Sequence, residues 1–203
     1  MAGNTRVWFA IMAAPLVLRD VFNAYRAQMG EEDDGFVFED ERAPITRVDV
    51  FVYRPRSTAG TTTFATIGMA AREMPAAPGP GGGGRAELHL VRRGRLARTD
   101  EGAIAARLAD LAIHPFVAGE QLNWGHMIGF DQDFPTFPGC RAVFLAGPLT
   151  DHGMDYVRTG SGDVRIINVV PITDTERRRG RTLPPLAFAS SLLEQGDIFD
   201  ERR

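Results

Sequence analysis

The residue types best suited to chemistry gather in one stretch, WGHMIGFDQDFPTFP, which begins at Trp124. Asp131 and Asp133 stand two positions apart, so in an extended chain their carboxylates share a face, where they could hold a cation or divide acid and base roles. His126 is the titratable neighbour that could join them. The alternative is a solvated turn before Pro135, with His126 hydrogen-bonded at a strand end. We favour that alternative, because the sequence places no nucleophile or third ligand nearby.

Metal ligands and nucleophiles follow no recognised spacing in the rest of the chain. No histidine stands four residues from another histidine or from the single cysteine, so a metal site would have to be assembled entirely by the fold. The histidines are His89, His114, His126 and His152. No Gly-x-Ser-x-Gly elbow is present. The sequence therefore predicts no catalytic residue, no metal and no cofactor.

Two further segments could bind phosphate. The segment 75–84, PAAPGPGGGG, is rich in glycine, but no Lys-Ser or Lys-Thr pair follows it. The residues after it read as a strand rather than as a helix whose N-terminus could face an anion. We interpret the segment as a flexible loop. The run ERRRGR at 176–181 could grip phosphate or an acidic surface, although such runs are normally solvated helix ends.

The composition is that of an ordinary globular protein. The chain has 203 residues, 44% of them hydrophobic and 24% charged, which is enough for one sizeable core. The only cysteine, Cys140, cannot form an internal disulfide, so we expect a reducing compartment, the cytoplasm. The net charge of −3 argues against a nucleic-acid partner. The apolar run 7–18 contains Pro15 and is too short to span a bilayer, and no clear signal-peptide cleavage site follows it, so we expect no membrane partner.

Periodicity and turn residues predict the secondary structure. Helices are expected at 15–30, from the N-cap Thr99 with Asp100 and Glu101 in the first turn to His114-Pro115, and at 184–196. Strands are expected at 46–55, 61–68, 85–93, 122–130, 141–147 and 164–173. Strands and helices do not alternate strictly, which favours an α+β fold: a mixed, mainly antiparallel β-sheet with helices packed on it. We divide the chain into an N-terminal segment 1–15, one domain 16–196 that contains the loop 75–84, and a polar tail 197–203.

Two of the predicted strands show a clear alternation of side chains. In 46–55, valines alternate with Asp49, Phe51 and Tyr53, so both faces are partly apolar. In 85–93, Glu87 and His89 face opposite to the apolar residues Ala86, Leu88 and Leu90.

Three motifs, FATIGM, GRAELHL and INVVPITDTE, occur in an order and at distances that resemble the suppressor-of-fused family. In that family a strand runs into a Thr-x-Gly-Met corner, a strand bearing Glu-Leu follows, and a late strand runs into Pro-Ile-Thr-x-x-Glu. The resemblance covers residues 16–182. The matching residues are Thr66, Gly68, Met69, Glu87, Leu88, Trp124, Pro171, Ile172, Thr173 and Glu176.

These motif residues are interpreted as parts of the framework. Gly68 permits a backbone turn that a side chain would obstruct, and Met69 can place its flexible thioether in the core. Pro171 is expected to end the pairing of the last strand. Thr173 and Glu176 have the spacing of a capping box at the start of a short helix.

The resemblance implies a protein that binds and does not catalyse. Animal members of the family bind and restrain a zinc-finger transcription factor of Hedgehog signalling, and bacterial members look like immunity proteins that neutralise toxins of polymorphic toxin systems. The animal protein clamps its peptide with a second domain that this chain does not show, and the corner here reads GMAARE without the usual acidic residue after the methionine. No clamp residue is carried over to this sequence.

We therefore expect a protein-binding domain, with immunity to a cognate toxin as the favoured role. The alternatives are a regulator that sequesters a peptide or transcription factor and, third, a metal-dependent hydrolase that uses Asp131, Asp133 or His126. The expected contact region is a sheet edge, the loop 131–138 or the loop 151–156. Aromatic anchors with an acidic rim would suit a partner surface there; the candidates are Phe130, Asp131, Asp133, Phe134 and Phe137. The alternative, which we favour, is that these aromatic side chains cover the core.

Overall fold

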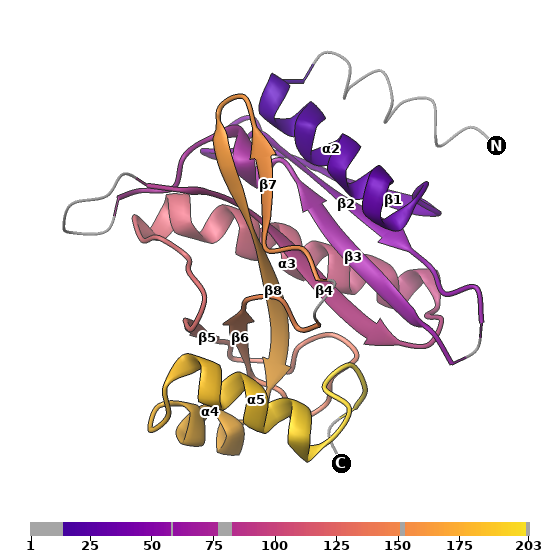
Figure 1. The fold of residues 1–203 in the computed structure, drawn as a ribbon, viewed down its shortest axis with the longest axis vertical. Coiled ribbons are helices and arrows are strands. Elements are labelled where there is room, and N and C mark those ends of the chain that lie inside the picture. Colours follow the sequence, from indigo (N-terminus) through magenta and orange to yellow (C-terminus); the bar gives the residue numbers. More distant parts are fainter. Residues whose placement is uncertain (1–13, 58, 77–82, 151–152, 202–203) are drawn as a thin grey trace.

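A single mixed sheet forms the centre of the molecule in the computed structural model, which describes residues 14–57, 59–76, 83–150 and 153–201 (Figure 1). Its strand order is β1-β2-β3-β4-β8-β6-β5, and β7 pairs with β8 beside this path. Only β4 and β8 run parallel to each other, and all other pairs are antiparallel. The predicted α+β fold with a mainly antiparallel sheet is confirmed. The strands are β1 (Asp34–Glu39), β2 (Arg47–Tyr53), β3 (Thr61–Ile67), β4 (Arg85–Arg93), β5 (Met127–Gly129), β6 (Ala142–Ala146), β7 (Tyr156–Thr159) and β8 (Gly162–Ile172).

Helices cover both faces of this sheet. Helix α3 (Arg98–Ala118) and helix α2 (Leu16–Met29) lie on opposite faces, and α4 (Asp174–Gly180) and α5 (Pro185–Gln195) pack near β6 and β8 (Figure 1). Alternation along the strands explains the two layers. Val48, Val50 and Val52 of β2 belong to the core under α3, whereas Phe51 and Tyr53 belong to the core under α2. The interpretation that strand 46–55 has apolar side chains on both faces is confirmed.

Several predicted boundaries were wrong. Helix α3 begins at Arg98 after Ala97, which supplies no side-chain cap, so Thr99 is not the N-cap. The helix also continues through Pro115 and ends at Gly119, whose left-handed conformation (φ +72°) terminates it. Pro115 removes one helical hydrogen bond. It is buried on the sheet side, and this burial offsets part of that loss.

Other differences concern strands. The sequence prediction missed β1 and β7, and of the predicted strand 122–130 only Met127–Gly129 pairs. Strand β8 runs through Pro171, which lies opposite Val143 of β6, so the expectation that Pro171 ends the pairing was wrong. Proline is tolerated there because β4 pairs with β8 only as far as Asn168, which leaves one side of β8 without a ladder neighbour.

The end of the chain is attached to the sheet. The backbone N–H of Arg93 donates to the carbonyl of Phe199 at 2.6 Å. Arg92, which is 6% exposed, pairs with Asp200 at 2.8 Å, and Arg93 pairs with Asp197. This part of the predicted polar tail is therefore held against β4. The predicted segment 1–15, the loop 75–84, the tail and His152 lie wholly or partly outside the described residues.

Candidate functional site

The family corner is a tight backbone crossing at the end of β3. Gly68 has φ +139°, a conformation that side chains rarely adopt. A Cβ there would clash with the carbonyl oxygen of Arg47 and lie 2.9 Å from the Cα of Val48. A single 3-10 turn, η1 (Met69–Ala71), follows, and Met69 is fully buried. Glycine is required because β2 passes directly over this position.

Glu87 of β4 holds this corner together. Its carboxylate accepts hydrogen bonds from the Thr66 hydroxyl at 2.6 Å, the Gly68 N–H at 2.8 Å and the Ala70 N–H at 2.9 Å. The Thr66 hydroxyl oxygen in turn accepts from the N–H of Leu88 at 2.8 Å. The residues of the Thr-x-Gly-Met and Glu-Leu motifs thus belong to one buried hydrogen-bond network. The sequence prediction missed these bonds, although a glutamate between apolar residues of a buried strand was a signal for them.

Burial governs the ionisation of Glu87. The side chain is 0% exposed, and loss of hydration raises the pKa of its carboxyl to about 7, against the lowering effect of the hydrogen bonds from Thr66 and from the corner N–H groups. His89, on the same face of β4, is also buried, and desolvation lowers the pKa of its imidazole to about 4. His89 is therefore neutral at physiological pH.

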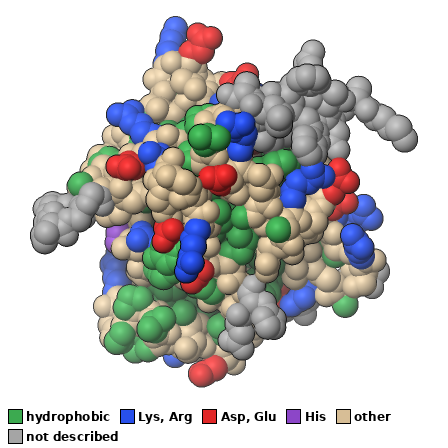
Figure 2. Space-filling model, turned by 45° about the horizontal axis from the view of Figure 1, so that its top comes forward, with side chains coloured by type: hydrophobic (Ala, Val, Ile, Leu, Met, Phe, Trp, Pro, Cys, Tyr) green, Lys and Arg blue, Asp and Glu red, His purple; other side chains and the backbone are tan. Residues whose placement is uncertain are grey.

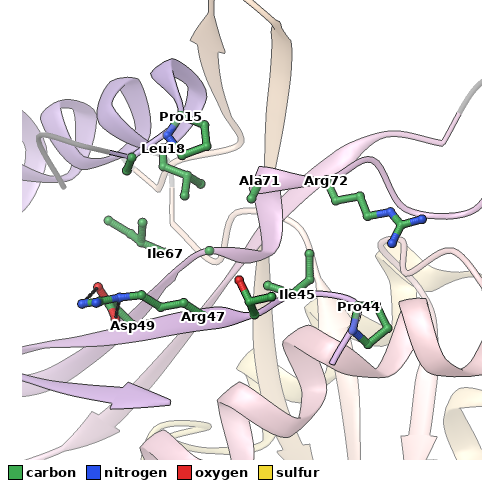
Figure 3. A pocket seen from close by; sticks show the side chains of 12 residues that line it. Pro15, Leu18, Pro44, Ile45, Arg47, Asp49, Ile67, Ala71 and Arg72 are labelled. Atoms are coloured by element: carbon green, nitrogen blue, oxygen red, sulfur yellow. Dashed lines mark hydrogen bonds and ion pairs between the residues drawn. The ribbon is translucent and has the colours of Figure 1, made fainter. Parts of the chain in front are cut away.

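A groove of about 490 Å³ lies beside the corner (Figure 3). Its walls come from the start of α2, the segment before β2, and the corner itself. Figure 3 shows Leu18, Ile45 and Ile67 around the space, with Arg72 on one side of the view and the Arg47–Asp49 pair on the other. The lining residues are Ala14, Pro15, Leu18, Pro44, Ile45, Thr46, Arg47, Asp49, Ile67, Gly68, Ala71 and Arg72.

Of the two arginines that line the groove, Arg47 is ion-paired and Arg72 is not paired with a described carboxylate. Arg47 donates to both oxygens of Asp49, at 2.9 and 3.0 Å, and its third nitrogen donates to Glu39 at 2.9 Å. Burial raises the pKa of the Asp49 carboxyl, and Arg47 opposes this by stabilising the ionised form. Arg72, by contrast, is exposed and forms no ion pair with any carboxylate of the described residues. Arg72 is therefore the lining cation that no described carboxylate neutralises.

Trp124 lies away from this groove, next to β7 and β8. Its indole N–H donates to the carbonyl of Ile166 at 3.1 Å. The ring lies 5.4 Å from that of Tyr156, and the guanidinium of Arg165 lies 5.6 Å above it. Trp124 thus joins the segment before β5 to β8.

The Pro-Ile-Thr-x-x-Glu motif joins the end of β8 to the start of α4. Pro171 and Ile172 are buried at the end of β8. The Thr173 hydroxyl accepts from the N–H of Glu176 at 3.2 Å, and the Glu176 carboxylate accepts from the N–H of Thr173 at 2.7 Å. The predicted capping box of α4 is confirmed.

The predicted partner surface is divided between core and solvent. Phe134 and Phe137 are 1% and 0% exposed and belong to the core under α3, so for these two side chains the core alternative is correct. Phe130 is half-buried, with the guanidinium of Arg107 4.9 Å from its ring. Only Asp131, Asp133 and part of Phe130 remain accessible to a partner.

Asp133 is occupied within its own loop. Its carboxylate accepts from the N–H of Gly139 at 2.8 Å and from Arg141 at 3.0 Å, and these bonds, the Gly139 bond first, lower its pKa. His126 is exposed in the turn before β5. Within the described part of the chain, no three His, Cys, Asp or Glu side chains form a group that could hold a metal ion. The structure does not assemble the proposed Asp131, Asp133 and His126 set into a metal site.

The surface and the helices are consistent with a globular domain. Figure 2 shows a face on which basic and acidic side chains are interspersed around apolar patches. In the described ranges, no helix combines the length and the hydrophobicity needed to cross a bilayer.

Comparison with known proteins decides the family. A family model described as "Suppressor of fused protein (SUFU)" matches residues 46–203, which is more than half of the chain. The chain belongs to the suppressor-of-fused family. No match was found among curated proteins.

Solved suppressor-of-fused structures share the fold at low identity. The homologue from Neisseria gonorrhoeae is 16% identical, with a TM-score of 0.64 over 91% of this chain and 93% of the other. A chain of the Sufu–Fu complex is 12% identical, with a TM-score of 0.62 over 91% and 87%. Drosophila Suppressor of Fused is 13% identical, with a TM-score of 0.61, and the match covers 92% of this chain but only 48% of that one.

Proposed function

We propose that this suppressor-of-fused chain acts in the cytoplasm by stoichiometric binding of another protein and performs no catalysis, and that its role is immunity to a cognate toxin. The supporting observation is that the polar residues of the family motifs form hydrogen bonds within the framework. Thr66 and Glu87 are occupied with each other and with backbone N–H groups, as are Thr173 and Glu176. Such groups build a framework, and a rigid framework is what a binding surface needs.

The proposed contact region is the edge of the sheet at β5 and the loop that follows it. Among the described strands β5 pairs with β6 alone, so its other side is an edge of the sheet. Phe130 and Asp131 lie directly after β5, one half-buried and one exposed. An aromatic anchor next to an acidic rim suits a basic partner surface and would raise the rate of association.

A regulatory role is the second candidate. The Sufu–Fu complex, whose chain has this fold, contains a suppressor-of-fused protein bound to Fu. On this reading the present chain sequesters a regulatory peptide or transcription factor. The identity of the captured partner separates the two roles.

The experiment is co-expression with the product of the neighbouring gene as the candidate toxin, combined with a pull-down. Immunity predicts survival and a one-to-one complex. Asp131→Arg should weaken binding about tenfold, since it reverses a rim charge. The matched control is Asp163→Arg, an exposed acid at the β7–β8 hairpin. A toxin that stays lethal, with an empty pull-down, contradicts immunity, and capture of a regulatory protein selects the second role. Metal-dependent turnover that His126→Ala abolishes would contradict both.

A further inference from the structure

We propose that the groove beside the Gly68 corner binds an acidic, hydrophobic segment of a partner protein, with a large apolar side chain in the groove and a carboxylate near Arg72. This inference rests on the proposed function as a protein-binding domain. It concerns a second contact region, on a different part of the sheet from the β5 edge.

The shape and lining of the groove suit an apolar side chain. Its volume of about 490 Å³ lies within the usual range for ligand sites. Leu18, Ile45 and Ile67 are at most 9% exposed and belong to the two cores on either side of the sheet, so they form fixed walls (Figure 3). Ala71 contributes only a methyl group. The absence of a larger side chain at this position leaves room for one from outside.

The charges around the groove select an anionic neighbour. Arg47 is shared between Asp49 of the lining and Glu39 beside it, whereas Arg72 has no ion pair with a described carboxylate. The N-terminus of α2 adds positive potential, because Pro15 supplies no capping side chain and the first turn contains no acidic residue. Complementarity therefore favours an acidic partner segment over a basic one.

The test is fluorescence anisotropy of the full chain with a labelled hexapeptide that carries two acidic residues on each side of a central Leu-Trp pair. Ala71→Trp fills the groove from an exposed backbone position and should abolish binding. Arg72→Glu should weaken binding about tenfold. Arg95→Glu, an exposed arginine after β4 at the opposite end of the sheet, is the matched control and should change nothing. Amide shifts in an NMR titration should concentrate at residues 67–72.

Several results overturn the proposal. These are equal binding by the Ala71→Trp chain, equal binding of a peptide with Ser-Ser at its centre, and equal binding of a peptide with lysines in place of the acids. Binding that appears only when residues 1–13 are deleted would also overturn it, because the chain's own leading segment would then be the occupant. The titration needs no natural partner. Its failure is therefore distinguishable from failure of the toxin rescue, which tests the proposed function itself.

Discussion

Replacement of Glu87 tests the physical account of the corner. In Glu87→Ala, the Thr66 hydroxyl and the N–H groups of Gly68 and Ala70 lose their common acceptor inside the core. An unsatisfied buried donor costs about 1–3 kcal/mol, and the hydroxyl can turn to another acceptor, so we expect a loss of about 3–5 kcal/mol in the free energy of unfolding. Glu87→Gln keeps one oxygen for the two N–H groups and should lose only about 1 kcal/mol.

The same carboxyl makes stability depend on pH. A free glutamate titrates near 4.5, whereas Glu87 titrates near 7 in the folded protein. Between these values the folded state keeps a proton that the unfolded state has released, so rising pH favours unfolding. The stabilisation that the protonated Glu87 carboxyl contributes to the folded state is fully present below pH 4.5 and is lost as the pH rises through 7. The difference of pKa corresponds to a decrease of about 3 kcal/mol across this window.

The assay is urea unfolding of wild type and Glu87→Gln, followed by circular dichroism at half-unit steps from pH 4.5 to 7.5. Subtracting the glutamine variant cancels the other titrating groups, since the substitution keeps the shape of the side chain. As the pH rises, the free energy of unfolding of the wild type should decrease relative to that of Glu87→Gln. A difference that stays constant, or that grows with pH, would refute the account, because the corner donors would then hold Glu87 ionised throughout.

Three further substitutions test other parts of the framework. Gly68→Ala should lower the midpoint of thermal unfolding by more than the control Gly160→Ala, whose Cβ would meet nothing within 4 Å, and equal midpoints would refute the steric account. Thr173→Ala should cost about 1 kcal/mol in urea unfolding by removing the cap of α4, and Thr173→Ser should restore it. Arg54→Met should cost about 3–5 kcal/mol, because it leaves the fully buried carboxylate of Glu101 without its two hydrogen bonds, and unchanged stability at pH 7 would refute that.

Local patterns in the sequence predicted much of the fold. Alternation in β2 predicted apolar side chains on both of its faces, and the Thr-x-x-Glu spacing predicted the cap of α4. These succeeded because each depends on side chains a few positions apart. The end of α3 failed for the opposite reason: contacts with the sheet offset the loss at Pro115, and no local rule contains those contacts.

Less of the candidate site than of the fold could be predicted from the sequence. The sequence left Phe134 and Phe137 either as partner anchors or, as we favoured, as a cover for the core, and only the structure shows that a loop closed by Asp133 and Arg141 turns both toward the core. Glu87 meets the corner only because β3 and β4 pair side by side. The groove depends on three segments that the sheet brings together, so its lining cannot be read from any one stretch of the chain.

The parallel pairing of β4 with β8 also has a consequence for folding during synthesis on the ribosome. Arg85 pairs with Val164, so the middle of the sheet stays open until the last third of the chain has been synthesised. Closing so long a loop is slow, and β4 meanwhile presents an edge to which other nascent chains can add. Truncated translation products should therefore aggregate, and the yield of native protein should depend on chaperones that shield this strand during synthesis.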